Sequence, residues 1–312
     1  MKYLAWFVGV AFTVFTVVYV VAFTSFGNSL LKPMIEGKIK EQTNLDSKLK
    51  IFSLDSSSFE LLLDLNANNS IFVKGNYSLS TLAFNVAYRV NLEELKTLQS
   101  LTSTQLQGSF HTDGAIVGDM EFIKVDGKSD IASSVTAYSV ELTDFNPTSI
   151  VAKMNSADLK SLLFMVNQKA YASAKINLDV NFKSVTPHKL DGNIKLETIN
   201  GKLNTQVMKK DFNVTIPDTA FNMNLDATLK GDDVDYAYAL NSNLAKLTSS
   251  GKIIPEPLLV DVKYAVDVKE LAVLKPMTGA DVRGSLKLSG EAKGSKEKMS
   301  VSGKTDFASS DT

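Results

Sequence analysis

Residues 90–136 recur as residues 266–312 of this 312-residue chain, without a gap. At this offset of 176 residues, 18 of the 47 aligned positions are identical. The matched pairs include Gly108/Gly284, Gly114/Gly290, Gly118/Gly294, Gly127/Gly303, Leu95/Leu271 and Leu98/Leu274. A repeat of this size is one supersecondary unit used more than once. Repeat architectures usually present extended surfaces rather than catalytic pockets, so the repeat favours a binding or structural protein over an enzyme.

From about Lys48 onward, apolar residues follow a period of two, most clearly in residues 84–92, 174–182, 221–229 and 258–268. Strict alternation gives each strand one apolar and one wet face, which is typical of antiparallel sheets. Turn signals separate the runs, at Asn66–Asn69, Asp126–Gly127, Asp191–Gly192, Asn200–Gly201 and Gly231–Asp232. At this spacing the pattern predicts roughly fifteen strands and a mainly β protein.

Short helices are expected at a few places in this β array. Ser29–Thr43 predicts an amphipathic helix that lies on a membrane or, as we favour, caps the end of the sheet. Leucines at i, i+3 predict helical inserts over Leu92–Leu101, Ser156–Val166 and Val268–Met277. The middle insert (NSADLKSL) is similar to NLEELKTL at an offset of 64 residues, which indicates a third, degenerate copy of the repeat.

Residues 4–23 carry no charged side chain. About 20 apolar residues in a helix span the bilayer core of about 30 Å, whereas a signal-peptide core has roughly 7–15. The segment therefore predicts an uncleaved transmembrane anchor. We expect an anchor over residues 1–26, an amphipathic helix and connector over 27–47, and a repetitive β region over 48–312. Because the first repeat copy continues as a strand past the equivalent of Thr312, we expect the natural chain to be longer.

The composition excludes several classes of function. A net charge of −1 gives no electrostatic case for nucleic acid. The chain has no cysteine, so thiol catalysis and thiolate metal sites are absent. His111 and His188 have no second ligand at a convincing spacing, and no catalytic motif occurs. We expect no metal and no cofactor.

The apolar face of so many strands is too large for three short helices to cover. The chain can bury it in a sandwich, close it into a barrel, or curl into an elongated open trough that holds something apolar. Because repeats stack linearly, we favour the trough, which would run about 70 Å for about fifteen strands at about 4.8 Å each. The candidate groove residues are Phe84, Val86, Tyr88, Ile176, Leu178, Val180, Phe182, Phe221, Met223, Leu225, Val260, Val262 and Tyr264.

The layout resembles the AsmA-like superfamily of TamB-type proteins. The resemblance rests on the anchor, the helix and spacer LLKPMIEGKIKEQTNLDSKLKI, the strand pair FSLDSSSFELLLDLNANN, and repeats of the form L-x-x-L, strand, G-x-x-x-G and V-x-G-x-x-D-x-A-S-S. It implies a single-pass protein of the bacterial inner membrane, with most of the chain in the periplasm as a curled β-groove.

The same resemblance implies a function in lipid transport. Phospholipid acyl chains would be the ligand, and movement would run between the inner and outer membranes. The alternative is a structural factor for outer-membrane protein assembly, which would act through an exposed sheet edge and contact an outer-membrane protein.

Overall fold

The computed structural model describes residues 23–312, except residues 67, 103, 187–188, 308–309 and 312. Of the predicted anchor over residues 1–26, only residues 23–26 are among those described, and His188 lies outside them as well. Within the described part, no helix combines the length and the apolar character needed to cross a membrane. The chain forms two compact units, one up to Ser129 with Thr143–Phe145, the other Asp130–Leu142 with Asn146–Thr312.

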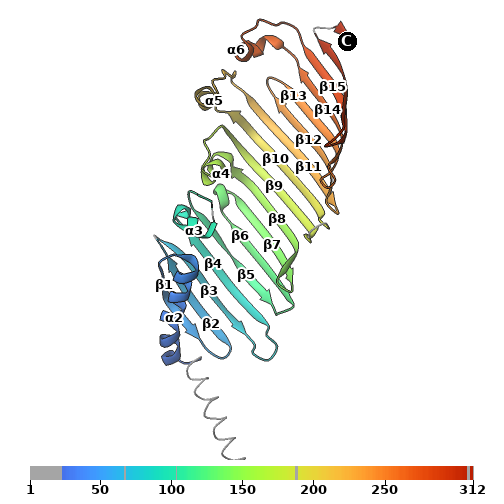
Figure 1. Ribbon diagram of the computed structural model, residues 1–312. Helices are drawn as coiled ribbons and strands as arrows, with labels where there is room; N and C mark the ends of the chain where they lie inside the picture. Colours follow the sequence, from blue (N-terminus) through green and yellow to red (C-terminus); the bar gives the residue numbers. More distant parts are fainter. Residues whose placement is uncertain (1–22, 67, 103, 187–188, 308–309, 312) are drawn as a thin grey trace, which may run out of the picture. The chain divides into compact units, whose positions relative to one another are not determined.

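Unit 1 is an open antiparallel sheet in which each strand from β1 to β6 pairs with the next (Figure 1). Its elements are α2 (Ser25–Thr43), β1 (Ser47–Leu54), β2 (Ser58–Leu65), β3 (Asn69–Tyr77), β4 (Phe84–Leu92), η1 (Leu95–Leu98), α3 (Gln99–Thr102), β5 (Phe110–Gly118) and β6 (Phe122–Ser129).

Unit 2 holds the later strands, and every strand from β8 to β17 pairs antiparallel with the next. Its elements are η2 (Ile131–Ser133), β7 (Val135–Thr143), β8 (Asn146–Asp158), α4 (Leu159–Met165), β9 (Ala172–Ser184), β10 (Asp191–Leu203), α5 (Thr205–Phe212), β11 (Ala220–Lys230), β12 (Asp233–Ser242), β13 (Lys246–Ile254), β14 (Leu259–Val268), η3 (Leu271–Leu274), α6 (Lys275–Thr278), β15 (Leu286–Ser295), β16 (Met299–Phe307) and β17 (Ser310–Asp311). The helices α4, α5 and α6 lie at one end of its strands (Figure 1).

Each unit is a single layer of strands. Among the described residues, the substantial strand contacts join neighbours in the sheet, and no pairing joins the first strand of a unit to its last. Among the described residues, Leu49 and Asn69 are the largest side chains with less than 2 % of their surface exposed. The predicted mainly β, antiparallel fold is confirmed, and within each unit the sheet is neither a closed barrel nor a sandwich.

The first helix packs against β1, the first strand of the sheet, in agreement with the predicted cap on the end of the sheet. The Leu49 backbone N–H donates to Oε1 of Glu36 at 2.7 Å, and Nδ2 of Asn28 donates to the Leu54 carbonyl at 3.2 Å. Because β1 pairs with β2 and with no other strand among the described residues, these bonds satisfy backbone groups that an edge strand leaves free. Helix α2 therefore covers the outer edge of β1. It begins at Ser25, four residues before the predicted start.

The sequence repeat is also a structural repeat. In each copy a 3₁₀ turn and a helical turn follow a strand (η1 with α3, η3 with α6), and a two-strand hairpin follows them. The Leu95 N–H donates to the Gly108 carbonyl at 3.0 Å, and the Leu271 N–H donates to the Gly284 carbonyl at 2.8 Å. Both glycines have positive φ, 82° and 95°, which explains why glycine stands at both positions.

Three of the predicted turns are wrong. Asp126–Gly127 lies inside β6, and Asp191–Gly192 and Asn200–Gly201 lie inside β10. Asn200 has a φ of 54° at an irregularity in β10, so the Asn-Gly pair forms a bulge rather than a hairpin turn. The predicted inserts appear as shorter helices than expected, and α5 was not predicted at all.

Candidate functional site

The strongest feature of unit 2 is an unbroken row of residues directly opposite one another on seven neighbouring strands. The register places all of them on the face of the sheet that carries Leu178, which we call the apolar face. We call this row the central ladder; it consists of Met154, Leu178, Leu196, Leu225, Tyr238, Ser249 and Tyr264. Six strand spacings of about 4.8 Å give it a length of about 29 Å.

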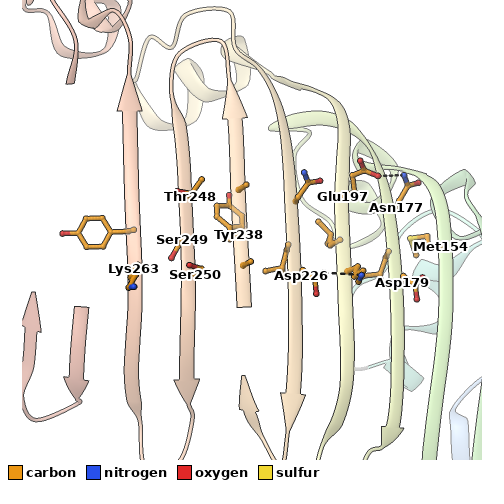
Figure 2. Close-up of a pocket in the computed structure, with 18 of the residues that line it drawn as sticks. Met154, Asn177, Asp179, Glu197, Asp226, Tyr238, Thr248, Ser249, Ser250 and Lys263 are labelled. Atoms are coloured by element: carbon orange, nitrogen blue, oxygen red, sulfur yellow. Dashed lines mark hydrogen bonds and ion pairs between the residues drawn. The ribbon is translucent and has the colours of Figure 1, made fainter. Parts of the chain in front are cut away.

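A concave region of about 770 Å³ lies over the central ladder. On each of β8 to β14 its lining is a ladder residue with its immediate chain neighbours, as Figure 2 shows for Ser249 between Thr248 and Ser250. Leu178, Leu225 and Tyr264 were predicted groove residues. Met154, Leu196, Tyr238 and Ser249 were not, although the alternation of β12 would have indicated Tyr238.

The other predicted residues of unit 2 share the apolar face in neighbouring rows. Val180 and Val262 belong to one row, Phe182 and Val260 to the next. On the other side of the ladder, Ile176 and Met223 share a row through Thr198, and Phe221 lies opposite Gly201. Period-two alternation therefore assigned these residues to the correct face.

Phe84, Val86 and Tyr88 lie on β4 of unit 1, also on one face of their strand. They are not part of the region over the central ladder. Their row continues onto β3, where Val73 lies opposite Tyr88 and Gly75 lies opposite Val86.

Almost all of the predicted groove residues are half-buried. Val86, 6 % exposed, is the exception. Half-burial is what a single-layer sheet produces, because neighbouring side chains cover each other's flanks while their tips face outward. The apolar face is thus neither a sealed core nor a set of isolated exposed residues, and the described strands form no second sheet over it.

Tyrosine side chains reach over glycines of the next strand, at equivalent places in the two repeat copies. A Cβ built on Gly290 would lie 2.6 Å from Oη of Tyr264, and one built on Gly114 would lie 2.7 Å from Oη of Tyr88. Tyr88 and Tyr264 are again 176 residues apart. Tyr88 lies opposite Gly114, which lies opposite Gly127. The Tyr88 hydroxyl donates to the Asp126 carbonyl at 3.5 Å, so the Asp-Gly pair of β6 lies beneath a tyrosine rather than in a turn. Glycines on one face also help a sheet to bend.

The opposite face of unit 2 is polar and charged. Lys195 pairs with Asp226 at 3.4 Å, and Nδ2 of Asn177 donates to Glu197 at 3.2 Å (Figure 2). Lys252 pairs with Asp233 at 2.6 Å, and hydrogen bonding to this carboxylate raises the pKa of Lys252. Exposed ion pairs contribute little to stability. They do make this face unsuitable for hydrocarbon, so the sheet is amphipathic.

The described residues offer no group of three or more His, Cys, Asp or Glu side chains placed to hold a metal ion. His111 has a carboxylate partner that was not expected, since its Nε2 lies 3.0 Å from Oε1 of Glu93. His111 and Glu93 flank the connection that holds η1 and α3, which indicates a structural contact.

Comparison with known protein families, curated proteins and solved structures finds no match to this chain. The resemblance to AsmA-like proteins therefore remains a prediction from the sequence layout.

Proposed function

We propose that this protein is a non-enzymatic, membrane-anchored carrier that moves phospholipid between the inner and outer membranes of a bacterium, with acyl chains held on the apolar face. The observation that carries the proposal is the central ladder, a row across β8–β14 that is made of Met, Leu and Tyr side chains except at Ser249. Large exposed apolar patches usually mark binding sites.

The dimensions of the ladder suit an acyl chain. One leaflet of a bilayer core is about 15 Å thick, half of about 30 Å. The central ladder, at about 29 Å, is longer than one extended acyl chain of that leaflet. Each methylene removed from water contributes about 0.8 kcal/mol. A chain lying along the ladder would therefore gain several kcal/mol, while its head group stays in water.

The backbone of the sheet also supports this proposal. Each strand from β9 to β15 pairs with a neighbour on both sides, so its backbone N–H and C=O groups are satisfied within the sheet. Satisfied backbone groups are the condition for contact with hydrocarbon. Movement along such a face would exchange one apolar contact for another and requires no chemical step.

The alternative function, assembly of outer-membrane proteins through a free sheet edge, has less support. Helix α2 occupies the edge of β1 through the bonds of Asn28 and Glu36. A client strand would have to displace this helix before it could pair there.

Photo-crosslinking in cells tests the proposal with a matched pair of neighbouring positions. Leu225 belongs to the central ladder, whereas Asn224 is exposed on the polar face and makes no side-chain hydrogen bond among the described residues. Asn177 is a poorer control, because its Oδ1 accepts the Ser156 N–H at 2.9 Å. A photo-reactive residue replaces either Leu225 or Asn224 in the full chain. Phospholipid adducts are then measured by mass spectrometry.

We expect phospholipid adducts at Leu225 and few at Asn224. Equal yields at the two positions, or protein adducts alone at Leu225, would remove the support for a lipid-carrying face and favour the scaffold function. A folded-state control is the protease resistance of both variants in the dark.

A further inference from the structure

Large apolar side chains protrude from successive turns at one end of unit 1. They lie in the β3–β4 loop, in the β5–β6 turn with the first residue of β6, and in the segment Thr143–Phe145. We call them the apolar turn cluster: Leu79 (58 % exposed), Leu82 (54 %), Met120 (51 %), Phe122 (44 %) and Phe145 (57 %). Single exposed apolar residues are ordinary, but a group of them at adjoining turns indicates an interaction surface.

The turns adjoin one another. Phe84, the first residue of β4, lies opposite Gly118, the last residue of β5, so the β3–β4 loop and the β5–β6 turn emerge at the same end. The Asp144 N–H donates to the Glu121 carbonyl at 2.9 Å, which holds the Thr143–Phe145 segment against the β5–β6 turn. The cluster is therefore one surface.

Two members of the cluster occupy backbone positions that disfavour them. Leu82 has a φ of 57° and Phe145 a φ of 62°, both in the left-handed region. A residue with a side chain loses roughly 1–2 kcal/mol there, and glycine or asparagine is the usual choice in turns. Since both side chains are exposed, their packing does not repay this cost within the unit. The unfavourable backbone points to a use for the apolar side chains themselves.

Helix α2 begins at the same end of unit 1. The bond from Asn28 to the Leu54 carbonyl places the start of α2 beside the end of β1. The Tyr77 N–H donates to the Ser57 carbonyl at 2.8 Å, so the β1–β2 turn adjoins the end of β3 and the loop that follows it. The charge-free segment of residues 4–23, which we predict to be the anchor, directly precedes α2 in the sequence.

We propose that the apolar turn cluster contacts the surface of the bilayer that holds the anchor, by inserting its side chains among the lipid head groups. The contact would fix the tilt of unit 1 against the membrane, which an anchor alone leaves free. It does not depend on lipid transfer, since an anchored scaffold would make the same contact.

The charges near the cluster identify the kind of lipid surface. The turns at residues 55–57, 78–83, 119–121 and 144–145 contain the acids Asp55, Asp119, Glu121 and Asp144, and no Lys or Arg. The carboxylate of Asp119 accepts the N–H groups of Phe122 (2.9 Å) and Glu121 (2.8 Å), which lowers its pKa and keeps it ionised. Basic clusters attract anionic lipid. This acidic surrounding predicts apolar insertion into zwitterionic lipid instead.

Site-specific labelling of the full chain in vesicles tests the proposal. Because the chain has no cysteine, Leu82→Cys, Met120→Cys and Gln99→Cys each give one labelling site. Gln99 is the matched control, since it is exposed and lies in α3 at the opposite end of the strands. Each variant carries a polarity-sensitive fluorophore in phosphatidylethanolamine–phosphatidylcholine vesicles, and nitroxide-labelled phospholipid is the quencher.

We expect lipid nitroxides to quench the labels at Leu82 and Met120 several-fold more than the label at Gln99. High salt or added phosphatidylglycerol should not increase the quenching. Quenching at Leu82 and Met120 that equals the value at Gln99 would overturn the proposal. Quenching that appears only with anionic lipid would overturn it too, because it would identify an electrostatic contact made by other residues. Met120 lies in an ordinary turn conformation, so it keeps the test valid if Leu82→Cys disturbs its loop.

Discussion

The substitution Gly290→Ala should disrupt β15 strongly, whereas Gly303→Ala on the neighbouring strand should not. A Cβ at Gly290 would lie 2.2 Å from the Ser302 carbonyl oxygen and 2.6 Å from Oη of Tyr264. The carbonyl belongs to the sheet backbone and cannot rotate away. Overpacking of this kind typically costs about 1–3 kcal/mol, and the loss of glycine flexibility in a strand returns about 0.5–1 kcal/mol. We expect a net cost of about 2 kcal/mol at most.

At Gly303 the same addition meets less resistance. The new Cβ would lie 2.9 Å from the Ser289 carbonyl oxygen and 3.2 Å from Oη of Tyr264. A shift of a few tenths of an ångström relieves these contacts. The remaining cost and the gain in strand propensity then nearly cancel, so the change in free energy should stay within about 0.5 kcal/mol.

Hydrogen exchange of the full chain in membrane nanodiscs measures the difference locally. At 1.4 kcal/mol per factor of ten, a cost of about 2 kcal/mol raises the exchange rate of β15 peptides by up to about 30-fold. Gly303→Ala should change it by less than about 3-fold. Tyr264→Ala should partly rescue Gly290→Ala, because it removes the ring but not the carbonyl. Similar exchange in the two alanine variants would refute the role assigned to Gly290.

Three further predictions concern the edge helix, the cap of α4 and the apolar face. Glu36→Ala should leave the buried Leu49 N–H without an acceptor at a cost of about 1–3 kcal/mol, seen as faster exchange of β1, whereas Glu36→Gln should retain most of the protection. The carboxylate of Asp158 caps α4, and its bonds to backbone N–H groups lower its pKa. The stabilisation is therefore present above the ordinary carboxyl pKa and is lost as the pH falls through the lower pKa of the folded state. Hydrogen exchange of α4 should accelerate in that acidic range in the native chain and not in Asp158→Asn. Leu225→Asp should reduce the phospholipid that co-purifies with the chain several-fold, while Asn224→Asp on the polar face should not, as lipid mass spectrometry can determine.

The sequence predicted the faces of the strands better than it predicted the connections. Alternation alone placed Leu178 on the apolar side of β9 and Leu225 on the apolar side of β11, because side chains of a regular strand point to the two faces in turn. The ladder that joins them depends on register, and the register depends on irregularities such as the one between Thr198 and Gly201. The Asn200–Gly201 pair at this bulge has the composition of a hairpin turn, so a local window predicts a turn there instead of a bulge.

The wrong turns and the missed helix have separate causes. Asp126–Gly127 has the composition of a hairpin turn, but it pairs within β6, and the Tyr88 hydroxyl two strands away donates to the Asp126 carbonyl at 3.5 Å. That contact is not visible in a local window. Helix α5 has too few apolar residues for a helical period. Its signal was Asn204, whose Oδ1 accepts the Val207 N–H at 3.3 Å as an N-cap.

The position of α2 along β1 gives the sheet of unit 1 a direction of growth. A sheet with one edge blocked can gain strands on one side only, as a filament with a capped end grows from the other end. Since the strands pair in chain order, each added hairpin would extend such an array by about 10 Å, two spacings of about 4.8 Å. Duplication of a repeat would thus lengthen the array in fixed steps and leave α2 and the first strands unchanged. The number of hairpins alone would set the length of such an array.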